Sequence, residues 1–97
     1  MFTSKERSHL KSLAANLQPV MQVGKGGVGE NLIKSLSDAL EARELIKITI
    51  LESATDVPRA LADEIAARLH AEVVIVMGRK AVLYRRSSRD GIRNIEY

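Results

Sequence analysis

The residues best suited to chemistry lie in one glycine-rich segment, Gly24-Lys25-Gly26-Gly27-Val28-Gly29. Glycine tolerates positive φ angles and lets another molecule approach the backbone closely, so four glycines in six positions call for a physical reason. Three interpretations are open: a loop that holds the phosphates of a nucleotide, a tight structural turn, and a loop that clamps nucleic acid.

The first interpretation, a nucleotide phosphate loop, is disfavoured by the residues that follow the glycines. Lys25 to Gly29 matches the K-G-G-x-G opening of deviant Walker-type ATPases, in which Lys and then Ser or Thr should come next. Here the next residues are Glu30 and Asn31. Glu30 would put a carboxylate where the anionic phosphates bind, and the magnesium-binding hydroxyl is missing.

The other two interpretations remain open on the glycine pattern alone. A short glycine-rich turn that serves chain reversal and helix packing is a weak motif that fits many folds. A GxxG clamp, here Gly24-Lys25-Gly26-Gly27, would bring a bare backbone against several nucleotides while Lys25 reaches a phosphate. The amides at the start of the following helix would favour an anion as well, and side chains at Gly24 or Gly27 would block the approach.

Charge is distributed unevenly along the 97 residues, although the net charge is only +3. Residues 1–29 carry four basic residues against one acidic, residues 30–77 five against nine, and residues 78–97 six against two. If the fold brings the two basic ends together, it creates the electrostatic footprint of a protein that binds a phosphate backbone. A mixed, solvated surface is the plainer alternative.

Several classes of site are disfavoured by composition. The chain has no cysteine, and its two histidines, His9 and His70, stand far apart without metal-ligand spacing. No nucleophile, base and orienting group can be assembled, so we expect neither an enzyme nor a cofactor. No apolar run reaches the roughly 20 residues of a membrane span, and the N-terminus has no secretory pattern, so we expect a cytoplasmic monomer that does not bind membranes.

Hydrophobic periodicity predicts seven elements. A capping box at Thr3 to Glu6 starts a helix that Pro19 ends, and a short strand follows at Val20–Val23. A helix runs from the glycines to about Ala42, and Leu45–Leu51 alternates as a strand with one polar face. Further along, the sequence predicts a helix capped by Asp56 with Pro58 in its first turn. The unbroken apolar run Val73–Met77 predicts a central strand covered on both faces. A hairpin at Gly78-Arg79-Lys80 then leads into an edge strand at Ala81–Arg85.

The element order α-β-α-β-α-β-β predicts a single compact α/β domain with a four-stranded mixed sheet. Two strand-helix-strand crossovers favour parallel pairing, and the final hairpin adds an antiparallel edge. We expect the domain to cover residues 1–86 and residues 87–97 to form a flexible basic tail.

Taken together, the motifs resemble the CRM domain of YhbY-type RNA-binding proteins over about residues 4–86. The similarity is carried, in order, by Lys5, by Leu10 to Ala14, by Leu17 to Val20, by the GxxG loop, by Glu44 to Ile48, and by Gly78 to Arg85. The combination is far more specific than any single piece.

The resemblance implies a fold akin to the C-terminal domain of bacterial translation initiation factor three, with a KH-like GxxG loop. It further implies binding to ribosomal RNA of large-subunit precursors, and thus a role in ribosome assembly. The RNA-binding positions implied are the loop residues Gly24, Lys25, Gly26 and Gly27 and the supporting basic residues Lys47, Arg79, Lys80, Arg85 and Arg86.

Plainer roles compete for some of these residues. Lys47 is by default a solvated lysine on the polar face of its strand, and Tyr84 a half-buried packing residue. The basic residues from Arg79 to Arg93 would form one basic end. Glu41, Glu44, Asp63 and Glu64 are most simply solvated helix faces, and the alternative function is a protein-protein adaptor that uses this acidic middle.

Overall fold

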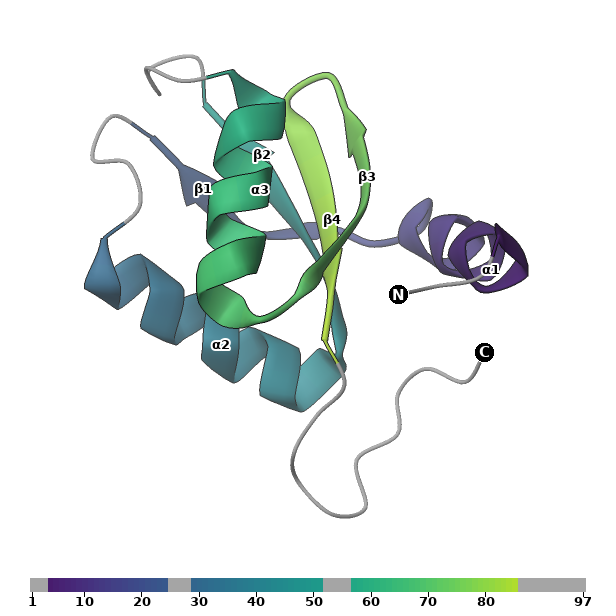
Figure 1. The fold of residues 1–97 in the computed structure, drawn as a ribbon, viewed down its shortest axis with the longest axis horizontal. Helices are drawn as coiled ribbons and strands as arrows, with labels where there is room; N and C mark the ends of the chain where they lie inside the picture. The colour runs from purple at the N-terminus through teal and green to yellow at the C-terminus, as the bar shows by residue number, and fades with distance from the viewer. Residues whose placement is uncertain (1–3, 25–28, 52–56, 86–97) are drawn as a thin grey trace.

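The computed structural model describes residues 4–24, 29–51 and 57–85 of the chain. They form a single compact α/β domain whose element order is the predicted one (Figure 1). No helix within these three ranges is long and apolar enough to cross a bilayer. The elements are α1 (Ser4–Ala14), β1 (Pro19–Val23), α2 (Glu30–Arg43), β2 (Leu45–Ile50), α3 (Pro58–Leu69), β3 (Glu72–Met77) and β4 (Lys80–Tyr84).

The helix ends show how local sequence sets the boundaries. Gly29 is the N-cap of α2, with extended backbone and no side-chain cap. α3 starts directly after Val57, which occupies the N-cap position, and Pro58 opens the first turn, where its missing N–H costs no hydrogen bond. The predicted cap Asp56 is therefore not the N-cap, and its own structure lies outside the described residues, as does that of Thr3.

The four strands form one mixed sheet in the order β1-β2-β4-β3. β1 and β2 are parallel, as a strand-helix-strand crossover requires, whereas β4 is antiparallel to both β2 and β3. The prediction of a central β3 and an edge β4 is therefore wrong. β4 enters between β2 and β3, and a register shift between Val73 and Ile75 interrupts the edge strand β3.

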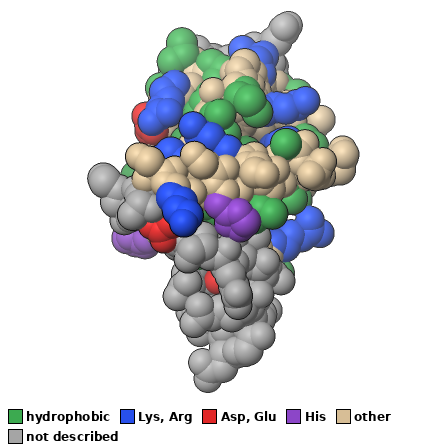
Figure 2. All heavy atoms as spheres, turned by 90° about the vertical axis from the view of Figure 1, so that its right-hand side faces the viewer, with side chains coloured by type: hydrophobic (Ala, Val, Ile, Leu, Met, Phe, Trp, Pro, Cys, Tyr) green, Lys and Arg blue, Asp and Glu red, His purple; other side chains and the backbone are tan. Residues whose placement is uncertain are grey.

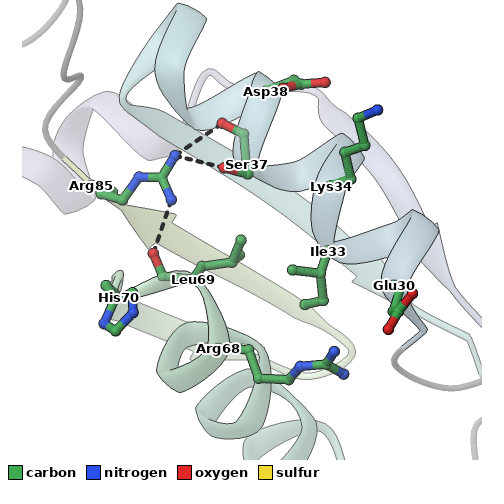
Figure 3. A pocket seen from close by; sticks show the side chains of 9 residues that line it. All are labelled: Glu30, Ile33, Lys34, Ser37, Asp38, Arg68, Leu69, His70 and Arg85. Carbon is green, nitrogen blue, oxygen red and sulfur yellow. Dashed lines mark hydrogen bonds between the residues drawn. The ribbon is translucent and has the colours of Figure 1, made fainter.

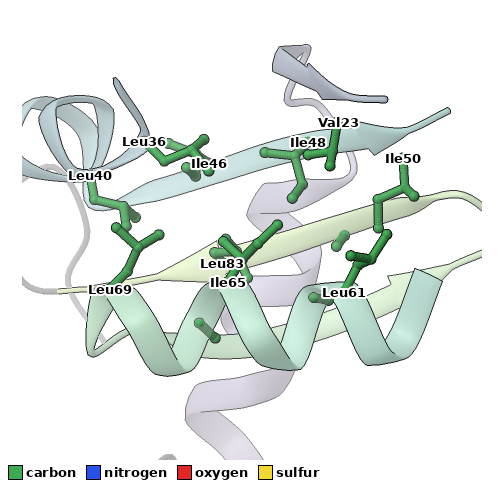
Figure 4. Close-up of a cluster of buried hydrophobic side chains, with 13 residues drawn as sticks. Val23, Leu36, Leu40, Ile46, Ile48, Ile50, Leu61, Ile65, Leu69 and Leu83 are labelled. Carbon is green, nitrogen blue, oxygen red and sulfur yellow. The ribbon is translucent and has the colours of Figure 1, made fainter. Parts of the chain in front are cut away.

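Helices cover both faces of the sheet. α2 and α3 pack on one face, where Leu36, Leu40 and Ile65 meet Ile48 and the other inward residues of the strands (Figure 4). On the other face, α1 contributes Leu10 and Ala14 to a second, smaller cluster; the strand residues of that cluster are Leu45, Val74, Val82 and Tyr84. We call this second side the α1 face.

Three residues are more buried than the sequence pattern predicts. Tyr84 is only 4% exposed because its strand is central in the sheet. Glu44 is fully buried at the C-terminus of α2, with a positive φ of 65°, and is not part of a solvated helix face. Lys47 is 8% exposed and is therefore not a solvated lysine.

Candidate nucleic-acid interface

One end of the sheet collects three connections, and we call it the loop end. β1 leads there into Gly24, β2 into Leu51, and β3 into the hairpin residues Gly78 and Arg79. Backbone hydrogen bonds join the three: the Leu51 N–H donates to the Val23 carbonyl at 2.8 Å, and the Ile50 N–H to the Arg79 carbonyl at 2.7 Å. The start of the glycine-rich segment therefore lies at the same end of the sheet as the hairpin (Figure 1).

The hairpin has a two-residue turn that depends on glycine. Met77 and Lys80 are paired across it, and Gly78 has a φ of 58°. A left-handed first turn residue is what a type II′ hairpin requires, and glycine adopts it without steric cost. This turn places Arg79 next to the end of β2.

Arg79 fixes the hairpin to the loop end through its guanidinium group. Its Nε donates to the Ile50 carbonyl at 2.7 Å, and its Nη2 donates to the Leu51 carbonyl at 2.5 Å. These bonds give Arg79 a positioning role in the protein itself. Lys80, the next residue, is exposed at the start of β4.

Figure 2 looks onto the side of the molecule that carries α1. Lys and Arg side chains, interspersed with hydrophobic ones, gather over the upper part of this surface, at the height of the hairpin in Figure 1. Of the site residues predicted from sequence, the structure places Gly24, Arg79 and Lys80 at one end of the sheet and Lys47 in the middle of β2.

Arg85 lies beyond the opposite end of β4, and the five strand residues between it and Arg79 make six residue steps, or about 20 Å. The expectation that Arg79, Lys80 and Arg85 form one basic end is therefore wrong. Strand β4 runs between them, and an extended strand carries its two ends apart.

Arg85 also has its guanidinium group occupied. Nη1 donates to the Leu69 carbonyl at 2.9 Å, and Nη2 donates to the Ser37 carbonyl and hydroxyl at 3.0 Å each (Figure 3). Nη2 also lies 3.4 Å from a Glu41 carboxylate oxygen. Arg85 thus ties α2 to the end of α3, beside a shallow pocket of about 420 Å³ that both helices line.

The acidic middle of the sequence does not form a continuous acidic surface. Glu44 is buried and the Glu41 side chain is only 17% exposed, next to Arg85. Asp63 and Glu64 are exposed as predicted, but the Asp63 carboxylate lies 3.3 Å from Arg59 on the same helix. The described residues therefore give little support to an acidic docking face.

The remaining predicted positions, Lys25, Gly26, Gly27 and Arg86, lie outside the described residues. Sequence reasoning missed Gln22, Thr49 and Met77, which the strand register aligns with Lys80 in one row across the sheet. The alternation of side chains along each strand could have shown which face of the sheet each of them occupies. Their alignment with one another could not be predicted, because it depends on the order of the strands in the sheet. Reasoning from sequence also missed Arg7, whose partners are on β3.

Comparison with known proteins agrees with this architecture. The family model of the CRS1 / YhbY (CRM) domain matches residues 2–85. The "Probable RNA-binding protein YqeI" of Bacillus subtilis is 39% identical over 90 residues, covering 93% of this chain and 94% of its own. An "RNA-binding protein" of Haemophilus influenzae is 30% identical over 91 residues, covering 94% and 92%.

The solution structure of a hypothetical protein from Staphylococcus aureus superimposes with a TM-score of 0.80 at 42% sequence identity. The match covers 99% of this chain and 98% of that one. With a family model that spans nearly all of the chain and relatives aligned almost end to end, the protein belongs to the CRS1 / YhbY (CRM) domain family.

Proposed function

We propose that this protein binds RNA, and that its ligand is ribosomal RNA in cytoplasmic precursors of the large ribosomal subunit. The relatives named as RNA-binding proteins support the first part, because they align over nearly the whole chain. The resemblance to YhbY-type proteins of ribosome assembly supports the second part.

The observation that carries the proposal is the convergence of Gly24, Leu51 and the Gly78-Arg79 hairpin at one end of the sheet. A GxxG segment that begins at this end has a neighbouring hairpin whose next residue, Lys80, is an exposed cation. In this proposal the Gly24–Gly27 backbone contacts the sugar-phosphate chain, and Lys25 and Lys80 bind phosphates. Shape then contributes more to recognition than base reading does.

Two of the basic residues predicted from sequence take other parts in this proposal. Arg79 positions the hairpin, because its guanidinium group donates to two backbone carbonyls of the chain. Arg85 stays outside the interface, because it lies at the far end of β4 and holds α2 and α3 together.

The proposal is tested by the salt dependence of binding to a fragment of large-subunit ribosomal RNA. Each phosphate contact contributes about 0.7 to 0.9 to the slope of log K against log salt concentration. We expect the Lys25→Ala, Lys80→Ala double variant to lose about 1.5 from the slope of the wild type. A Lys34→Ala, Arg59→Ala double variant removes the same charge from exposed positions on α2 and α3 and should leave the slope unchanged.

Bulky replacements at Gly24 and Gly27 test the backbone contact separately. A folded variant with Val at both positions should bind the RNA more weakly than the wild type, because side chains at these positions would keep the nucleic acid away from the main chain. If such a variant binds undiminished, or if wild-type affinity is indifferent to salt, the proposal fails and the protein-protein adaptor becomes the better hypothesis.

A further inference from the structure

Helix α1 covers only part of the α1 face of the sheet. The helix packs against Leu45, Val82 and their neighbours, toward the end of the sheet opposite the loop end. Beyond this cluster the register aligns one residue from each strand, because Gln22 pairs with Thr49, Thr49 with Lys80, and Lys80 with Met77. We call these four residues the sheet row. Their strand neighbours Val23, Ile48, Val76 and Ala81 belong to the opposite core, which places the sheet row on the α1 face.

The sheet row is open to solvent and lacks acidic groups. Gln22 and Lys80 are exposed, Met77 is 50% exposed, and Thr49 is half-buried. Glu72 is the one acidic residue in the four strands, and it pairs with Tyr84 at the other end of β4 from Lys80. The row spans four strands, or about 14 Å, and combines a cation, two hydrogen-bonding side chains and a thioether.

Lys47 lies beside the row, two residues before Thr49 on the same face of β2. The Lys47 residue is only 8% exposed, so most of its aliphatic chain is packed, and the described part of the chain offers its ammonium group no hydrogen-bond or ion-pair partner. A lysine can bury its aliphatic chain and keep its ammonium group at the surface, where an anion can reach it. A phosphate group is an anion that accepts charge-assisted hydrogen bonds from an ammonium group.

These observations point to one occupant. Two cations on one face, with no acidic residue among the strand positions beside them, complement a polyanion, whereas the neutral amide, hydroxyl and thioether groups of the sheet row match sugars, base edges and base faces. The row is also continuous with the loop end, because Gln22 is separated from Gly24 by Val23 alone.

We propose that the sheet row, together with Lys47 beside it, is a docking surface for a single-stranded RNA segment, in which Lys47 and Lys80 bind phosphates and Gln22, Thr49 and Met77 contact sugars and bases. The inference rests on the proposed function and extends it from the loop end onto the sheet. In this arrangement the RNA segment runs from the glycine-rich segment across the sheet, next to α1.

Lys47→Met is the sharpest variant, because methionine keeps an unbranched apolar chain at this packed position and removes the charge. The probe is a single-stranded oligouridylate of roughly 12 nucleotides, a length in the range of single-strand binding sites. We expect Lys47→Met to remain folded, to bind roughly 3- to 10-fold more weakly, and to lose about 0.7 from the salt slope. Lys34→Met, the same change on exposed α2, should alter neither quantity.

An NMR titration of the wild type with the same oligonucleotide gives an independent readout. The amide signals of Gln22, Thr49, Met77 and Lys80 should shift, and those of Ser37 and Arg68, beside the α2–α3 pocket, should not. If RNA binds with a normal salt slope but Lys47→Met is unaffected and the row does not shift, the inference is wrong and the proposed function stands. If neither the oligonucleotide nor ribosomal RNA binds, both the inference and the proposed function are wrong. The same conclusion follows if the amide signals of the sheet row shift only when a protein ligand is added.

Discussion

The Arg79 guanidinium group donates a hydrogen bond of 2.5 Å to the Leu51 carbonyl, joining the β3–β4 hairpin to the end of β2. A second hydrogen bond runs from Nε to the Ile50 carbonyl, so one guanidinium group binds two successive carbonyls. The geometry needs the planar fork of arginine, which lysine does not have.

We therefore expect Arg79→Ala to lower the free energy of unfolding by about 2 kcal/mol, since two charge-assisted bonds are lost and two partly buried carbonyls lose their donors. Arg79→Lys should recover less than half of the loss. Chemical denaturation measures both values. Lys80→Ala, one residue further along and exposed, serves as the control and should change the midpoint little. An unchanged midpoint for Arg79→Ala would show that the hairpin does not need this contact.

Arg85 should contribute to stability and not to RNA binding. Its removal leaves the Leu69 and Ser37 carbonyls and the Glu41 carboxylate without this donor, so Arg85→Met should cost about 3 kcal/mol of unfolding free energy. Arg59→Ala, which removes an exposed ion pair to Asp63, should cost less than about 0.5 kcal/mol. In RNA titrations under folding conditions, Arg85→Met should keep the wild-type salt slope. A reduced slope would place Arg85 in the interface.

Arg7 should protect the edge strand. Among the described strands, β3 pairs with β4 alone, and Arg7 Nη1 donates to the carbonyls of Val73 and Val74 at 3.0 and 2.8 Å. Open edges of apolar strands recruit other strands, and charged groups placed against them prevent this. Arg7→Ala should therefore self-associate more at equal concentration, as measured by light scattering after size-exclusion chromatography. Lys11→Ala, an exposed change on the same helix, is the control, and equal behaviour of the two variants would refute the role.

Gly78 should tolerate substitution less well than Gly29. An alanine Cβ at Gly78 would meet no atom within 4 Å, so any cost of Gly78→Ala comes from the φ of 58° alone. That cost is about 1 kcal/mol, and Gly78→Asn should lose less because asparagine tolerates the left-handed region. Gly29→Ser, at an N-cap with extended backbone and free space, should be neutral or slightly stabilising. Thermal unfolding followed by circular dichroism orders the three variants.

Sequence by itself determined the number and order of the elements, the parallel β1–β2 pair and the Gly78-Arg79 hairpin. These features depend on patterns within some ten residues: the stripe of Leu32, Leu36 and Leu40, the alternation of Ile46, Ile48 and Ile50, and a glycine that allows a left-handed turn. The family resemblance could also be read at this level, because it rests on the order of such local motifs.

Only the tertiary structure decided which strand lies at the centre of the sheet and which basic side chains are exposed to a ligand rather than bound within the protein. β4 and β3 are both apolar, so periodicity cannot tell which one pairs with β2. Once β4 takes that place, Arg79 and Arg85 lie at opposite ends and Lys80 joins Thr49 in a row. The burial of Lys47 and Glu44 and the partners of Arg7 likewise depend on contacts between segments far apart in the chain, whose free energies are settled by packing and not by local propensity.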